Sequence, residues 1–264
     1  MQIKKGIIMI KKIDHLIILT PDPYETSKQI EEAFGLVAPP VMEFGMFVSA
    51  MFTFGNVNIE VLKLGDKQSF KPYLYGIAFE PNKEPWELLD DLKQANIEHT
   101  LPIKQSTQMV SWTNIMLKGL LDKEMPSSYG MQKNTTFSRY LAKFFEKLMG
   151  FDFVVKALMK DVGESMVFFC SYDERIKAYQ AYSQKVFSAF DGGTYGLKGV
   201  ESIIIEKEKS NTAWERLGTP QDEASVQLAF IESDKNRLHS IVLNAEKPYD
   251  NKEIMIGDVK FVIR

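Results

Sequence analysis

Apolar and polar positions alternate in short runs along most of the chain, which predicts many strands with a few helices between them. The first run, "IDHLIILT" (13–20), is apolar and rich in β-branched residues, so it predicts a buried strand. The next residues, "PDPYETSKQIEEAFG" (21–35), predict a helix. Asp22 supplies an N-cap, Pro23 stands at the first helical position, and Gly35 follows the last turn.

The same order of elements recurs along the sequence. Two further strands follow the first helix, "GMFVSAMFTFG" and "NVNIEVLKLG", with a tight hairpin at Gly55 and Asn56. A second unit contains "YLYGIAFEPN", the helix "PWELLDDLKQAN", a strand near Leu101, and the strands "MVSWTNIML" and "SMVFFCSY". A third unit contains "GVESIIIEKE", the short helix "SNTAWERLG", "SVQLAFIES", "RLHSIVLNAE" and "DVKFVIR". The openings of the three units resemble one another, which indicates an internal repeat.

These patterns predict an α+β fold with three parts. Residues 10–172 are expected to form one domain of two paired units, interrupted by a helical insertion at about 120–163. Residues 173–196 are expected to form a helix and a linker, and residues 197–264 a third unit. The apolar stripe of the insertion favours a helix packed on the protein's own core, with a lid or a dimer contact as alternatives. A lone third unit needs a covering surface, either the insertion or a second chain in a homodimer.

Composition narrows the classes of function. The chain has 264 residues, 45% of them apolar, and a net charge of −3. This balance gives no electrostatic case for binding nucleic acid or an anionic membrane. No apolar stretch approaches the roughly 20 residues that span a bilayer. The single cysteine, Cys170, lies in an apolar strand and is expected to be a buried thiol, and one cysteine fits a reducing, cytoplasmic setting.

His15 is the first of three histidines and interrupts an apolar strand. By itself it is either a metal ligand or a core histidine with its hydrogen bonds satisfied. Glu60 is similarly placed in "NVNIEVL", where alternation puts it on one face with Asn58 and Leu62. Carboxylates are seldom fully buried unless they are paired or bound to a metal.

These stretches together resemble the vicinal oxygen chelate superfamily, which includes glyoxalase I, bleomycin-resistance proteins and extradiol dioxygenases. The resemblance is carried by "DHLIILTPD" with its helix ending at Gly35, by "GNVNIEVL" about 45 residues after the histidine, and by "LKGVESIIIEKE". It implies βαβββ modules that pair to enclose a cavity. It also implies metal ligands from the first and last strands of a module, which are the positions of His15 and Glu60. An imidazole and a carboxylate there would suit Zn²⁺, Fe²⁺, Mn²⁺ or Ni²⁺.

The remaining ligands that the resemblance implies are missing from the sequence. The positions that match His15 and Glu60 are Tyr75 and Phe169, or a neighbour of Phe169, in the second unit, and Ser202 and Val262 in the third. None is a good ligand for a divalent cation. A catalytic zinc usually takes three protein ligands. Three interpretations of His15 and Glu60 therefore remain. They are half of a metal site, a structural hydrogen bond, or acid and base groups that work without metal.

Two functions follow from these readings. The first is an enzyme, a lyase, isomerase or dioxygenase, in which His15 and Glu60 act on a small oxygen-rich molecule with a divalent metal. The second is a metal-free protein that binds or sequesters a small molecule in the same cavity. In both, Asn58, Tyr75, Trp112 and Phe169 are the expected ligand-binding residues, although core packing is the alternative for each aromatic side chain.

Overall fold

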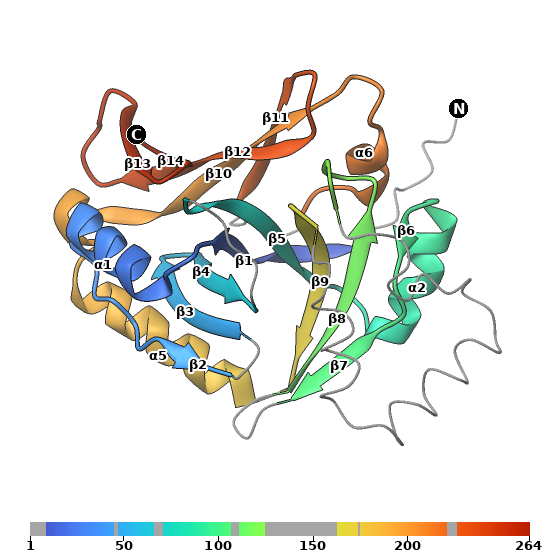
Figure 1. Cartoon of the computed structure of the whole chain (residues 1–264), viewed down its shortest axis with the longest axis horizontal. Helices are drawn as coiled ribbons and strands as arrows, with labels where there is room; N and C mark the ends of the chain where they lie inside the picture. Colours follow the sequence, from blue (N-terminus) through green and yellow to red (C-terminus); the bar gives the residue numbers. More distant parts are fainter. Residues whose placement is uncertain are drawn as a thin grey trace.

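The computed structural model describes residues 9–44, 47–65, 71–106, 111–124, 163–173, 175–220 and 226–264. Within these ranges the chain builds two sheets, one of nine strands and one of five (Figure 1). The α+β class predicted from the sequence is confirmed. The predicted helical insertion lies almost entirely outside the described residues.

The larger sheet contains two units of the βαβββ type that lie side by side. The first unit runs through β1 (Ile10–Leu19), α1 (Pro23–Phe34), β2 (Met42–Glu43), β3 (Phe47–Phe54) and β4 (Val57–Leu64). The second runs through β5 (Tyr73–Pro81), α2 (Pro85–Gln94), β6 (Glu98–His99), β7 (Ile103–Ser106), β8 (Ser111–Lys118) and β9 (Met166–Tyr172). Strand order is β2-β3-β4-β1-β5-β9-β8-β6, with β7 paired to β8, so β1 and β5 meet in the centre.

Local sequence signals account for the first unit. Asp22 accepts hydrogen bonds from the backbone N–H of Tyr24 (2.9 Å) and Glu25 (3.1 Å), and so begins α1 as predicted. Gly35 ends the helix in the left-handed conformation, with φ of 66°. Gly55, with φ of 67°, makes the β3–β4 turn at the predicted hairpin.

The second sheet is built from the last third of the chain. After α5 (Arg175–Ala189) and the 3₁₀ turn η1 (Gly193–Tyr195) come β10 (Leu197–Lys207), α6 (Ala213–Leu217), β11 (Gln227–Glu232), β12 (Arg237–Ala245), β13 (Lys252–Ile256) and β14 (Val259–Ile263). Strand order is β11-β10-β12-β14-β13. In a complete module the first strand pairs in parallel with the last, as β1 does with β4. Here β10 pairs in parallel with β11 and β12 with β14, so the segment contains two shortened units rather than one complete module.

Both sheets carry the same approximate two-fold symmetry at their centres. In the β1–β5 ladder His15 faces Ala78 and Gly76 faces Ile17; in the β10–β12 ladder Ser202 faces Val242 and Ser240 faces Ile204. Each of these four strands has an extra, bulged residue next to that position, which is Asp14, Tyr75, Glu201 or His239. His15 therefore corresponds to Gly76, Ser202 and Ser240.

The two sheets share one core on the side of the helices. We call the face of the nine-stranded sheet that meets α1, α2 and the second sheet the outer face. Its side chains and those of the second sheet form one buried apolar cluster. Phe34 of α1 contacts both Phe54 and Phe261, at ring centroid distances of 5.4 and 5.0 Å. The surface that covers the second sheet is thus the outer face of the first, and the homodimer stays a prediction.

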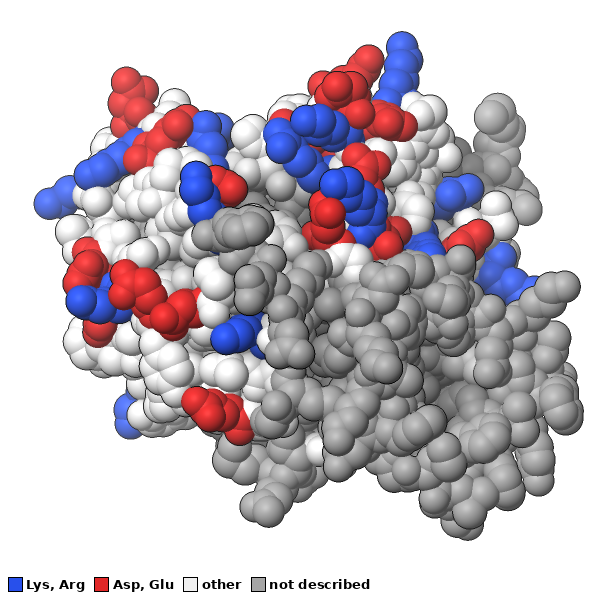
Figure 2. All heavy atoms as spheres, in the orientation of Figure 1, with Lys and Arg blue, Asp and Glu red and all other residues white. Residues whose placement is uncertain are grey.

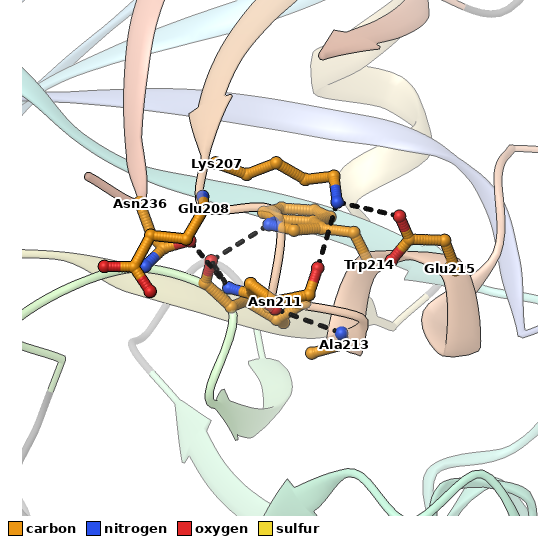
Figure 3. Close-up of polar contacts among 8 residues, drawn as sticks. Lys207, Glu208, Asn211, Ala213, Trp214, Glu215 and Asn236 are labelled. Carbon is orange, nitrogen blue, oxygen red and sulfur yellow. Dashed lines mark hydrogen bonds and ion pairs between the residues drawn. The ribbon is translucent and has the colours of Figure 1, made fainter. Parts of the chain in front are cut away.

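Polar contacts fix the second sheet to the end of β8. Asn236 donates to Asp122 through its side-chain amide (3.0 Å), and Trp214 and Asn211 both donate to the carbonyl oxygen of Leu120, at 2.9 and 3.2 Å. The amide oxygen of Asn236 accepts from Asn211 and from a backbone N–H (Figure 3). We call Leu120, Asp122, Asn211, Trp214 and Asn236 the inter-sheet clamp. It holds the segment after β8 at a defined place against α6 and β12.

None of the described helices is long and apolar enough to cross a membrane. On the face of the molecule shown in Figure 2, lysine and arginine side chains alternate with acidic ones over the described surface. The view shows no extended region of a single charge among them.

Candidate functional site on the inner face of the large sheet

The second face of the nine-stranded sheet, here called the inner face, carries both residues of the predicted site. It has its own apolar cluster, separate from the main core, formed by Ile17, Leu19, Leu62, Leu64, Tyr75, Ala78, Phe168 and Cys170. Around it lie half-buried aromatic and methionine side chains, namely Phe47, Tyr73, Trp112, Met116, Met166 and Tyr172. The sheet curls strongly, so this face is the hollow side (Figure 1).

His15 and Glu60 lie together on the inner face. His15 is 4% exposed, and its Nε2 atom is 3.6 Å from Oε2 of Glu60. That separation is an ion-pair distance rather than a hydrogen bond. Ser49 of β3 donates to the other carboxylate oxygen of Glu60 at 2.6 Å. The predicted pair therefore exists, and Nε2 and Oε2 lie side by side without a hydrogen bond between them.

Asp14 is a third member of the site. Its Oδ2 atom is 2.6 Å from Nδ1 of His15 and also accepts a hydrogen bond from the hydroxyl of Tyr172 at 3.1 Å. Because a carboxylate only accepts, the proton of this bond lies on Nδ1 of the imidazole. Strand alternation alone would send Asp14 to the face opposite His15. The bulge between Ile13 and His15 brings both side chains to the inner face.

The surroundings shift the acid–base behaviour of these groups. Burial is the largest single influence on His15 and lowers its pKa, but the hydrogen bond and charge of Asp14, with the charge of Glu60, together raise the pKa above 6.5. Burial and the nearby charge of Asp14 raise the pKa of Tyr172 well above its usual value, so this hydroxyl stays a donor. Burial likewise raises the pKa of the Cys170 thiol, in keeping with the inert thiol expected from the sequence.

The expected ligand-binding residues have different positions. Asn58 lies beside His15 on the inner face, and its amide oxygen accepts from Thr53 at 3.0 Å. Tyr75 is fully buried in the inner-face cluster, and Trp112 is half-buried beside it. Phe169 instead packs in the main core against Phe79, on the outer face.

The sequence match to Glu60 in the second unit was Phe169 or a neighbour, and the ladders assign this place to Phe168. Its ring meets the His15 ring edge-on at 5.6 Å. In the ladders, Phe168 pairs with Ala78 as Glu60 pairs with Ile17, so it is the residue that corresponds to Glu60. The bulge at Tyr75 shifts the register of β5 and puts Gly76, and not Tyr75, at the position of His15.

The donor set does not fit a catalytic metal centre. Among the described residues, no group of three or more histidine, cysteine, aspartate or glutamate side chains is arranged to hold a metal ion. His15 and Glu60 offer one atom each, and Asp14 is turned to the far nitrogen of the imidazole. At Gly76 a Cβ atom would lie 2.7 Å from the carbonyl oxygen of Met166, so that position has no room for any ligand side chain.

Comparisons with known proteins agree with the fold. No family model and no curated protein matches the sequence. A hypothetical protein from Staphylococcus aureus superposes with a TM-score of 0.59 at 10% identity, over 98% of this chain and 99% of that one. Homoprotocatechuate 2,3-dioxygenase from Arthrobacter globiformis superposes with a TM-score of 0.51 at 12% identity, over 99% of this chain and 82% of that one. The chain therefore shares its overall fold with these two proteins. At these identities the likeness concerns the fold alone.

Proposed function

We propose that the inner face binds a small molecule and that His15 and Glu60 move a proton on it without a metal ion. The observation that carries the proposal is the buried His15, held at Nδ1 by Asp14 and facing Glu60 with Nε2. A general acid and a general base must lie within reach of one reacting group. These two atoms are 3.6 Å apart on a face that also contains a buried apolar cluster.

The proton balance is that of an isomerase acting on a hydroxy-carbonyl compound. The carboxylate of Glu60 takes a proton from the hydroxyl-bearing carbon next to a carbonyl group, and the electron pair of that C–H bond forms the C=C bond of an enediol while the carbonyl π pair moves to its oxygen. The protonated Nε2 of His15 gives its proton to that oxygen. Glu60 then returns its proton to the neighbouring carbon while His15 takes the hydroxyl proton of the first carbon, so the carbonyl group has moved by one carbon and both side chains recover their starting states.

The test is solvent exchange on a simple carbon acid. We would follow the loss of the hydroxymethyl proton signals of hydroxyacetone in D₂O by NMR. The wild type should exchange them faster than buffer does, and H15Q and E60Q should each lose ~100-fold or more of that rate. The matched control is E253Q, because Glu253 is paired with Lys260 on the second sheet. A wild-type rate equal to that of buffer, or full rates in both site variants, contradicts the proposal.

A second function is favoured by the apolar lining. Half-buried Phe47, Tyr73, Trp112, Met116 and Met166 surround the polar group and suit a partly apolar molecule. In that case the protein sequesters its ligand, and His15 with Glu60 only orients it. Small-molecule binding that persists in H15Q, together with no hydroxyacetone exchange by the wild type, would favour sequestration over proton transfer.

A further inference from the structure

Among the residues that the structure describes, the inner face contains one buried side-chain oxygen with no hydrogen-bond partner. Asn114 of β8 is 7% exposed, and its side-chain oxygen has no hydrogen-bond donor within reach. Alternation along β8 places Asn114 on the inner face with Trp112 and Met116, and it faces Cys170 of β9 in the ladder. A buried acceptor left without a donor costs about 1–3 kcal/mol, so its presence here calls for an explanation.

Asn114 ends a row of polar side chains that crosses the inner face. Cys170 faces it on β9, and Tyr172, two residues further along, donates to Asp14. Asp14 holds His15, which faces Glu60 of β4. Three strand steps separate β1 from β8, or roughly 14 Å along the sheet. A ligand that contacts both His15 and Asn114 has to span about this distance.

Charge limits what this molecule can be. The centre of the inner face holds two carboxylates, Asp14 and Glu60, and one imidazole, so it carries no net positive charge in either protonation state of His15. Among the described residues, two lysines share this face near its ends. Lys12 is 3.2 Å from Glu80, and the charge of Lys118 acts on Glu124. Within the described part of the chain, a carboxylate or phosphate ligand would meet this repulsion with only Lys12 and Lys118, near the ends of the face, to offset it.

We infer that Asn114 is the anchor for an uncharged ligand, whose O–H or N–H group donates to its side-chain oxygen while the other end lies against His15 and Glu60. The inference rests on the proposed function for the second contact only. It assigns the ligand to the class of neutral phenols, alcohols and amides. Trp112, next to Asn114 on the same face, offers an aromatic surface on which the body of the ligand can pack.

The experiment uses two probes of the same shape, neutral 4-hydroxybenzamide and anionic 4-hydroxybenzoate. Ligand-observed saturation-transfer NMR should detect the amide bound to the wild type, and the acid at least tenfold more weakly. N114L should lose amide binding tenfold or more, because leucine has a similar volume and no acceptor. The matched control is S27A in α1, since Ser27 is also buried with an unpartnered oxygen but lies in the helix that covers the outer face.

A second readout needs no ligand. Removing an unpaired buried acceptor should raise the melting temperature of N114L by roughly 2–12 °C, because the ligand-free protein no longer carries its cost. If Asn114 instead stabilised the ligand-free fold, N114L would have a lower melting temperature than the wild type. Equal or tighter binding of the acid, amide binding unchanged in N114L, or a lower melting temperature of N114L overturns the inference.

These outcomes separate the inference from the proposed function. If amide binding depends on Asn114 while the wild type shows no hydroxyacetone exchange, the anchor stands and proton transfer fails. If exchange depends on His15 and Glu60 while N114L binds the amide normally, the proposed function stands and the anchor fails.

Discussion

Replacing Asp14 with asparagine should change the sign of the pKa shift of His15. In the wild type, the hydrogen bond and charge of Asp14 outweigh the effect of burial, which is the largest single influence on His15 and lowers its pKa. In D14N the amide still accepts from Nδ1 but carries no charge. Burial then dominates, although the weaker influence of Glu60 remains. We expect the pKa of His15 to fall from above 6.5 in the wild type to below 6.5 in D14N.

The sign of the stability change follows by linkage. A histidine whose folded pKa is raised adds stability that is complete below its unfolded pKa and is lost as pH rises through the folded pKa. D14N should therefore lower the free energy of unfolding most at acid pH and least at alkaline pH. A charge-assisted hydrogen bond contributes about 1.5–3 kcal/mol. For a chain of this size that lowers the melting temperature by roughly 3–12 °C at pH values below about 6.

Two measurements check this. Thermal unfolding of wild type and D14N on either side of the histidine titration should show the larger difference at the lower pH, and an NMR titration of the imidazole gives the two pKa values directly. Y172F is the matched control, because it removes the other hydrogen bond to Asp14 and should cost a similar amount at every pH in that range. The reasoning would be refuted if D14N lowered the melting temperature equally at both pH values, or if the pKa of the His15 imidazole did not fall.

Four further predictions concern Asn236, Glu124, Gly76 and the metal content of the protein. N236A removes three hydrogen bonds of the inter-sheet clamp and should cost roughly 2–4 kcal/mol in urea unfolding, with no effect on the imidazole pKa of His15. Burial raises the pKa of Glu124 to about 7, so the free energy of unfolding should fall by about 3 kcal/mol between pH 4.5 and 7, and E124Q should flatten that slope. G76A should destabilise by about 1–3 kcal/mol in the same assay, since its Cβ meets a neighbouring strand. The purified wild type should contain less than one equivalent of Zn, Fe, Mn or Ni, and a full equivalent lost in H15A would overturn the metal-free reading.

Periodicity and capping predicted most of the first unit because those signals are local. Asp22, Gly35 and the turn at Gly55 act within a few residues of the elements that they begin or end. The pairing of β9 with β5 could only be suggested, since it joins segments about ninety residues apart. The two shortened units of the second sheet were missed for a similar reason. A strand order depends on which edges meet, and that information is not contained in the alternation of any one strand.

The site was predicted in part for a related physical reason. His15 and Glu60 occupy regular positions in their strands, so alternation places them on one face. Asp14 reaches the same face only through a bulge, and a bulge has no dependable sequence signal when the extra residue is not glycine. The same irregularity at Tyr75 displaced the comparison of the two opening strands by one residue, so that Tyr75 was matched to His15 in place of Gly76.

The four repeats explain why the site is asymmetric. Each of the four central strands, β1, β5, β10 and β12, has one position equivalent to His15. In β5, β10 and β12 that position holds Gly76, Ser202 and Ser240. Only His15 and Gly76 lie on the inner face. Gly76 is held to glycine by the carbonyl oxygen of Met166. A second ligand opposite His15 would therefore require the β5 and β9 backbones to move apart, not a single substitution. On this argument G76H should unfold the sheet and not create a metal site. Gain of stoichiometric zinc by a folded G76H protein would show that the close approach of β5 and β9 does not limit the site.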